Sequence, residues 1–210
     1  MAAVSETIVR EYFELREFLV RQHRKYIGQT RHEDEDDIDF FVLNPHPRAH
    51  EGELPFVLGS ADLPFIQRAV VVVKGWHTET FSTARLVASP EIFRFVEPKV
   101  FQQAARAFGK DGAPLKILVV PALPQAAEAR EESIALLRSK GIDAVIPFRT
   151  MLSDLVSETE INRNYTKSDL LQIIRILKNY DLLKDPQLEL FNKTRRKTLK
   201  PRESKRQSED

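Results

Sequence analysis

The sequence predicts an α/β protein with a mixed β-sheet between helices, and two observations carry this prediction. Two aliphatic runs, Arg68–Trp76 and Leu115–Val120, are typical of strands that are buried on both faces. The predicted elements follow the order helix, three strands, helix, strand, helix, strand. Strands that alternate with helices are expected to pair in parallel, whereas three consecutive strands are expected to form an antiparallel meander.

The first half of the chain contains one helix and two strands before the valine run. Ser5–Arg16 has apolar residues near helical spacing, and Ser5 is a suitable N-cap residue. Phe18–Ile27 alternates imperfectly between apolar and charged residues, as a half-exposed strand does. An acidic run at Glu33–Asp39 then leads into the apolar strand Ile38–Leu43.

The second half alternates between helix and strand, after a long connection at Ala49–Pro64 that contains glycine and proline. Pro98 is expected to break or kink the helix predicted at Pro90–Phe108, because proline lacks an amide hydrogen. Gly141 is a typical helix stop. The elements around the strand Leu115–Val120 are helices at Pro90–Phe108, Gln125–Lys140 and Thr150–Glu158, and a strand at Asp143–Phe148.

The chain is expected to consist of a core at residues 1–158, a helical extension at 159–191 and a basic tail at 192–210. Within the extension, Tyr165–Leu183 predicts a helix capped by Thr166 or Ser168. Its apolar stripe is wide, which leaves two interpretations open: packing against the core, or binding of a protein partner or a second copy of the chain. The tail has almost no large apolar residues and is expected to be disordered.

Composition and charge narrow the classes of function. The chain has no cysteine, so neither disulfides nor thiolate chemistry is available. Its net charge of +1 combines a tail of eight Lys/Arg and three Asp/Glu, net +5, with a body of net −4. No signal peptide or membrane span is indicated, which predicts a soluble cytoplasmic protein. The glycine-rich turns of nucleoside-triphosphate and dinucleotide sites and the hydrolase nucleophile elbow are missing from the sequence.

Two residues carry a family resemblance. Asp39 precedes the apolar Phe40–Val42, and Lys74 ends the valine strand. With the preceding helix and strand, this arrangement resembles the PD-(D/E)xK superfamily of restriction endonuclease-like nucleases over Ser5–Phe148. The resemblance implies a three-layer sandwich with an αβββαβ core, and Mg²⁺-dependent hydrolysis of phosphodiester bonds.

The same resemblance implies roles for individual residues. Asp39 would be a metal ligand and Lys74 the lysine that activates water, but Val72 occupies the position of the second acid. One carboxylate is a weak site for Mg²⁺, which prefers several oxygen ligands. Either an acid comes from elsewhere, or the fold is kept for binding without cleavage. The candidate acids are Glu11 and Glu14 on the first helix, Asp37 and Glu79.

Structural interpretations stand beside these roles. Asp39 could simply end a solvated acidic turn, and Lys74 could extend its amine to solvent from a buried strand. Trp76 and His77 follow Lys74 and are candidate nucleic-acid contacts, although a core tryptophan and a structural histidine are the simpler interpretations of the pattern.

Two functions therefore remain: a nuclease-like protein that associates with nucleic acid with impaired catalysis, or a scaffold that binds a protein through Tyr165–Leu183. A basic groove across Lys74 favours the first, and a large exposed apolar face on the extension favours the second.

Overall fold

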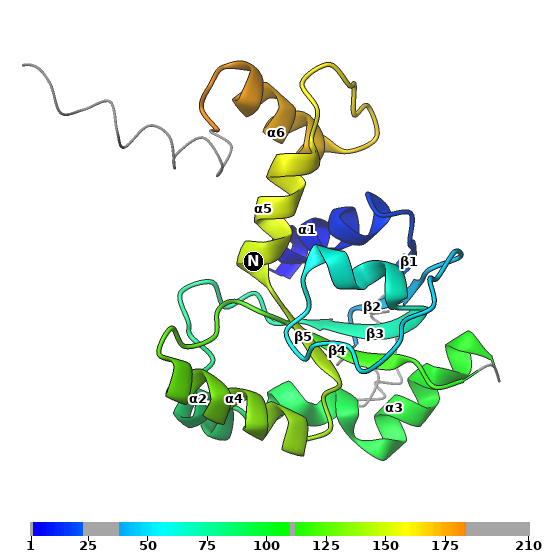
Figure 1. Cartoon of the computed structure of the whole chain (residues 1–210), viewed down its shortest axis with the longest axis vertical. Helices are drawn as coiled ribbons and strands as arrows, with labels where there is room; N and C mark the ends of the chain where they lie inside the picture. Colours follow the sequence, from blue (N-terminus) through cyan, green and yellow to red (C-terminus); the bar gives the residue numbers. More distant parts are fainter. Residues whose placement is uncertain (1, 23–37, 110–111, 184–210) are drawn as a thin grey trace, which may run out of the picture.

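Five strands form one mixed sheet in the computed structural model, which describes residues 2–22, 38–109 and 112–183 (Figure 1). The spatial order of the strands equals their order in the chain. The first three strands pair antiparallel and the last three pair parallel, as the sequence predicts. The strands are β1 (Leu19–Gln22), β2 (Phe40–Leu43), β3 (Arg68–Val73), β4 (Leu115–Val120) and β5 (Ala144–Pro147).

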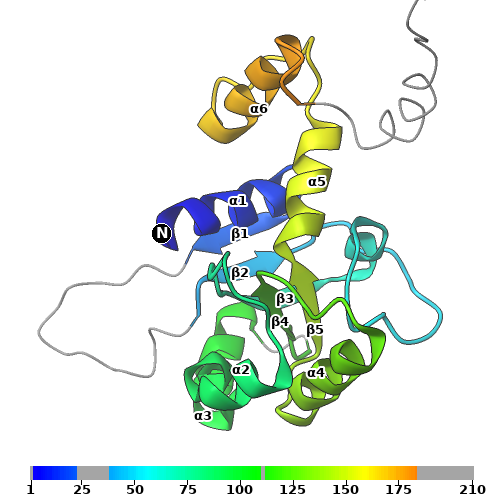
Figure 2. The ribbon, with the colours of Figure 1, turned by 90° about the vertical axis from the view of Figure 1, so that its left-hand side faces the viewer.

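Helices cover both faces of the sheet, which confirms the predicted α/β architecture (Figure 2). Each face carries its own apolar cluster. The first face packs against α1 (Ala2–Glu14), η2 (Ser60–Phe65) and α5 (Phe148–Glu158), and α6 (Asp169–Asn179) packs on α1 and α5. The second face packs against α2 (Thr83–Ala88), η3 (Pro90–Val96), α3 (Pro98–Ala105), η4 (Arg106–Phe108) and α4 (Ala127–Ser139).

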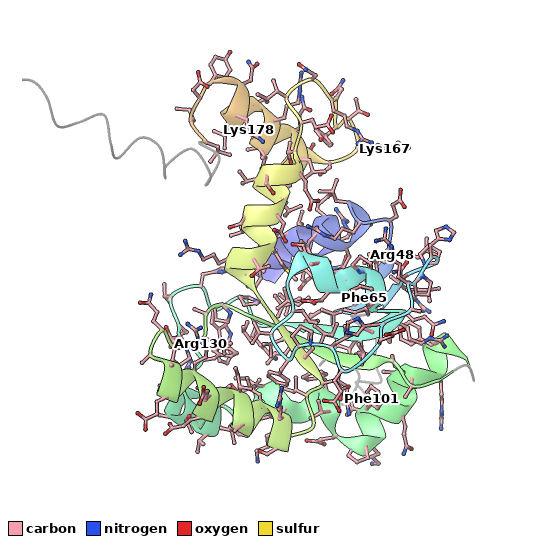
Figure 3. All side chains as sticks on the ribbon, viewed as in Figure 1. Arg48, Phe65, Phe101, Arg130, Lys167 and Lys178 are labelled. Atoms are coloured by element: carbon pink, nitrogen blue, oxygen red, sulfur yellow. The ribbon has the colours of Figure 1, made fainter. Side chains whose placement is uncertain are left out.

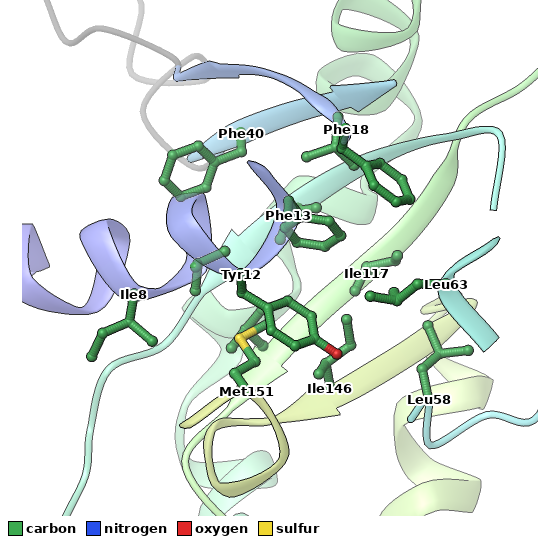
Figure 4. Close-up of a cluster of buried hydrophobic side chains, with 14 of the residues drawn as sticks. Ile8, Tyr12, Phe13, Phe18, Phe40, Leu58, Leu63, Ile117, Ile146 and Met151 are labelled. Atoms are coloured by element: carbon green, nitrogen blue, oxygen red, sulfur yellow. The ribbon is translucent and has the colours of Figure 1, made fainter. Parts of the chain in front are cut away.

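The valine run is the central strand of the sheet. Val71 packs into the first cluster, while Val70 and Val72 pack into the second, because successive side chains of a strand point to opposite faces. In the first cluster, Tyr12 and Phe13 of α1 lie over the sheet beside other aromatic and aliphatic side chains (Figure 4). The strand is therefore buried on both faces, as its sequence indicates.

Several local predictions change in detail. The helix expected at Pro90–Phe108 is broken at Pro98 into η3, α3 and η4, which confirms the predicted break. The six-residue helix α2 has no counterpart among the expected elements. The prediction that Ser5 caps the first helix is wrong: α1 begins at Ala2, and Ser5 lies inside it. Residues 23–37, which include Asp37 and most of the acidic run, and residues 184–210 lie outside the described part of the chain.

Part of the long connection at 49–64 pairs with the sheet. Val57 forms a parallel bridge with Val145 of β5. The amide of Val145 donates to the carbonyl of Phe56 over 2.7 Å, and the amide of Leu58 donates to the carbonyl of Val145 over 2.9 Å. These bonds tie the segment around Val57 to the outer side of β5.

The helix α6 packs against the core. The hydroxyl of Ser168 accepts a hydrogen bond from the amide of Leu171 over 3.2 Å, so Ser168 is the capping residue of the two that the sequence offers. Leu171 and Ile174 are buried in the first apolar cluster, which also contains α1 and α5 side chains. No helix in the described ranges is long and apolar enough to cross a membrane.

Candidate nucleic-acid interface

The carboxyl ends of β3, β4 and β5 meet at one edge of the sheet, where ligands of open α/β sheets commonly bind. The helices α4 and α5 begin at this edge, and their N-cap residues, Ala126 and Pro147, supply no side-chain cap. Arg130, labelled in Figure 3, donates from Nε to the carbonyl of Pro124 over 2.9 Å in the connection between β4 and α4. The edge therefore combines helix amino termini, which attract anions, with an arginine.

Lys74 and Asp39 lie at this same end of β3. The amide of Lys74 donates to the carbonyl of Val119 over 3.1 Å, so Lys74 continues the pairing of β3 with β4. On the other side, Asp39 Oδ2 accepts the amide of Val73 over 2.6 Å, and the amide of Asp39 donates to the carbonyl of Val71 over 3.2 Å. The carboxylate of Asp39 thus accepts the hydrogen bond that a backbone carbonyl accepts elsewhere in the sheet. The donor is Val73, the residue before Lys74.

Val72 occupies the position of the expected second acid, and its side chain is only 1% exposed. It belongs to the apolar cluster that also contains Ile38, Phe41, Phe81 and Leu86. An ionised carboxylate in such surroundings is costly unless it is paired. Position 72 is therefore part of the core.

Trp76 is held among side chains on the α2 side of the edge. Its ring meets Phe81 edge-on, with 5.6 Å between ring centroids, and the Arg85 guanidinium lies 4.9 Å from its ring centroid. Arg85 Nε also lies 3.5 Å from Glu79 Oε2. Glu79, one of the candidate acids, therefore pairs with an arginine that stacks on Trp76.

His77 turns toward α1 and α5 instead. Its Nε2 lies 2.9 Å from the hydroxyl of Ser5 on α1, and its ring meets Phe148 of α5 edge-on with centroids 4.6 Å apart. Gly75 lies between Lys74 and Trp76 in the sequence, and its lack of a side chain allows α1 to approach closely. A Cβ at Gly75 would lie 2.3 Å from Ser5 Oγ and 2.9 Å from Ser5 Cβ.

The candidate acids of α1 lie further from this edge. The helix runs from Ser5, which touches Gly75, back toward the start of β3, so Glu11 and Glu14 are about 9 and 13 Å further along its axis. Glu11 is buried, with Oε1 3.5 Å from Arg10, and Glu14 lies 3.9 Å from Arg10. Desolvation raises the pKa of Glu14, while Arg10 opposes this effect.

Glu6 is the α1 carboxylate that follows Ser5 directly, and sequence reasoning did not select it. Its Oε2 accepts a hydrogen bond from Gln22 Nε2 over 2.6 Å. Gln22 pairs with Phe40, the residue after Asp39, so Glu6 lies on the same side of the sheet end as Asp39. Its position next to Ser5 could have suggested it, but only if the contact of Ser5 with the end of β3 had been known.

Comparisons with protein-family models, with curated proteins and with solved structures found no match. Within the described ranges, no group of three or more His, Asp or Glu side chains is arranged to hold a metal ion. The fold and the site together define an α/β protein with a five-stranded mixed sheet and flanking helices, and with a polar edge at the carboxyl ends of its parallel strands.

Proposed function

We propose that this protein binds nucleic acid at the carboxyl edge of its parallel strands and has lost metal-dependent cleavage. The observation that carries the proposal is that Lys74 continues β3 at the end of the sheet where α4 and α5 begin without side-chain caps. Cations and free helix amides are the groups that bind phosphate oxygens, and phosphate contacts dominate affinity for nucleic acid. Arg85 on α2 and Arg130 on α4 add cationic groups beside the connections that follow β3 and β4.

A restriction endonuclease-like ancestry is part of this proposal. It is supported by the order of α1, the meander β1–β2–β3 and the parallel strands β4 and β5, together with Asp39 and Lys74 at one end of β3. The loss of cleavage is supported by Val72, whose apolar surroundings do not suit a metal ligand, and by the bond from Val73 to Asp39. Magnesium is therefore not expected to be needed for binding.

The test compares the affinity for a fluorescent DNA or RNA oligonucleotide across salt concentrations. Lys74→Gln should lower affinity and reduce the slope of log K against log salt by about 0.9, the effect of one lost phosphate contact on a duplex. Lys140→Gln is the matched control, because Lys140 follows α4 at the start of the connection to β5, at the opposite edge. Equal effects of the two substitutions, or no binding by the wild type, would refute the proposal.

The same samples are then incubated with Mg²⁺ or Mn²⁺ at millimolar concentration. The proposal expects intact oligonucleotide and unchanged affinity, since cationic side chains and helix amides bind the phosphates without a metal ion. Cleavage that disappears in Asp39→Asn would restore the nuclease interpretation, with an acid recruited from outside position 72.

A second candidate function is binding of a protein through α6. The favouring observation is a set of exposed apolar side chains on and after this helix, Ile173, Ile176, Tyr180 and Leu182, with exposed fractions of 44 to 71%. They are four of the nine exposed large apolar residues in the described ranges. Such a concentration marks an interaction surface more often than scattered exposure does.

A further inference from the structure

The helix α6 has two apolar faces, and only one of them is used by the core. Leu171 and Ile174 are buried against the first apolar cluster. On the opposite side, Ile173 is 55% exposed, Ile176 44% and Tyr180 71%. A helix that packs on one face only needs one apolar stripe, so the second stripe calls for a partner.

The exposed stripe has the spacing of a helix-pairing seam. Asp169, Ile173, Ile176 and Tyr180 follow one another at intervals of four, three and four residues, which is the alternation that keeps side chains on one line of a helix. All four residues are exposed. We refer to these four residues as the α6 seam.

We propose that the α6 seam binds the same seam of a second copy of this chain, with the two helices antiparallel. This proposal rests on the second candidate function, protein binding through α6, and names the protein that binds there. In this arrangement Ile173 faces the partner's Ile176 and Asp169 faces the partner's Tyr180, because the seam read backwards matches itself. A twofold interface requires such self-complementarity, since the same patch serves both subunits.

The ends of the seam are chemically complementary. The Asp169 carboxylate accepts a hydrogen bond from the phenol of the partner's Tyr180, and bonds to ionised acceptors are the stronger kind. Antiparallel helices also place the negative end of each helix dipole beside the positive end of the other. A parallel pair would instead bring the two Asp169 carboxylates together.

The basic residues of α6 are turned away from the seam. Arg175 Nε donates to the carbonyl of Ile161 over 2.7 Å. Lys178 Nζ, labelled in Figure 3, donates to the carbonyls of Val156 and Thr159 over 3.0 Å each. Like charges of two copies therefore do not oppose each other across the seam, a repulsion that would otherwise prevent self-association.

The size of the seam sets the expected strength. Four side chains per copy cover less area than an interface of standard size, so a monomer–dimer equilibrium at tens of micromolar is expected rather than an obligate dimer. The helix α6 stands at the end of the molecule opposite α2 and α3 (Figures 1 and 2).

The experiment measures sedimentation of the full chain from low micromolar to several hundred micromolar, without nucleic acid. The wild type should dimerise, and Ile173→Glu or Ile176→Lys should each weaken the dimer at least about tenfold, since each places an unpaired charge in an apolar contact. Val87→Glu on α2 is the control, because Val87 is also exposed, at 68%, and α2 lies at the other end of the molecule from α6. It should leave the dimer unchanged, and circular dichroism should show that all variants fold.

Mixing the two variants tests the register. In the antiparallel pair Ile173→Glu of one copy faces Ile176→Lys of the other, while the remaining two isoleucines stay in contact, so the mixture should associate more tightly than either variant alone. A wild type that stays monomeric throughout, a mixture that associates no better than its components, or an equal loss in Val87→Glu would each overturn the proposal. Because nucleic acid is absent, none of these outcomes bears on binding at the Lys74 edge.

Discussion

Replacing Val72 with glutamate would restore the acid that the nuclease resemblance expects at this position. The side chain of Val72 is 1% exposed and packs with Ile38, Phe41 and other apolar residues. If position 72 is core, as this packing indicates, Val72→Glu places a carboxyl group in an apolar cluster near Asp39. Both burial and the neighbouring carboxylate then raise the pKa of the introduced group.

The size of the effect follows from the linkage between pKa and stability. The carboxyl has a pKa of about 4.3 in the unfolded chain, and buried glutamates reach about 8 to 9. A pKa raised in the folded state means that stability falls as pH rises above the unfolded pKa, by about 1.4 kcal/mol per pH unit. From about pH 4.5 to about pH 7.5, Val72→Glu should therefore lose about 4 kcal/mol relative to a neutral control.

The assay is urea denaturation at several pH values, with Val72→Gln as the neutral control of matching shape. The stability lost in Val72→Gln measures the effect of polarity and size. The difference in stability between Val72→Glu and Val72→Gln measures the effect of the charge. Mg²⁺ at millimolar concentration should not recover the loss, because this ion keeps several waters and the cluster is closed and apolar. Parallel stability curves of the two variants would show that the carboxyl at position 72 is not buried, and recovery by Mg²⁺ would show that it can hold a metal ion.

Three further predictions concern Gly75, Asp39 and Glu158. Gly75→Ala should destabilise the fold by about 1–3 kcal/mol through overpacking against Ser5, and Ser5→Gly in the same chain should recover part of this loss, as measured by urea denaturation. Asp39→Ala should cost about 1–3 kcal/mol because a β3 amide loses its acceptor, whereas Asp39→Asn should cost less, as measured by thermal and urea unfolding. Desolvation raises the pKa of Glu158 despite the opposing charge of Arg16, so Glu158→Gln should stabilise more at pH 7 than at pH 4.

Each of these predictions has an outcome that contradicts it. Gly75→Ala with wild-type stability would mean that α1 shifts freely from the end of β3. An asparagine at position 39 that destabilises as much as alanine would assign Asp39 an ionic role beyond its bond to the Val73 amide. A larger benefit of Glu158→Gln at pH 4 would show that the ion pair with Arg16, whose Nη2 lies 2.5 Å from Glu158, outweighs burial.

The sequence predicts the sheet well because its strongest signals are local. Four consecutive valines indicate a strand buried on both faces, and β3 is that strand. Pro98 predicts the break between η3 and α3 from the chemistry of its own ring. The helix α2 was not predicted, because six residues are too few for an apolar period to stand out.

The site is harder to predict because its contacts join distant segments. Ser5 resembles an N-cap residue in sequence, yet its partner is His77, 72 residues away. The bond from the Val73 amide to the Asp39 carboxylate joins residues 34 positions apart, so no local pattern indicates it. Glu6 becomes a candidate site residue only once α1 is known to cross the end of β3.

The segment around Val57 has a consequence for how this protein behaves at high concentration. β5 is the last strand of the sheet, and an outer strand with unpaired amides and carbonyls invites other chains to add strands to it. Here the backbone of Phe56 and Leu58 already bonds to both polar groups of Val145. Another chain could add a strand to β5 only after the segment around Val57 has detached from it. Mutations that weaken this attachment should therefore promote fibrous aggregates while leaving the helices intact.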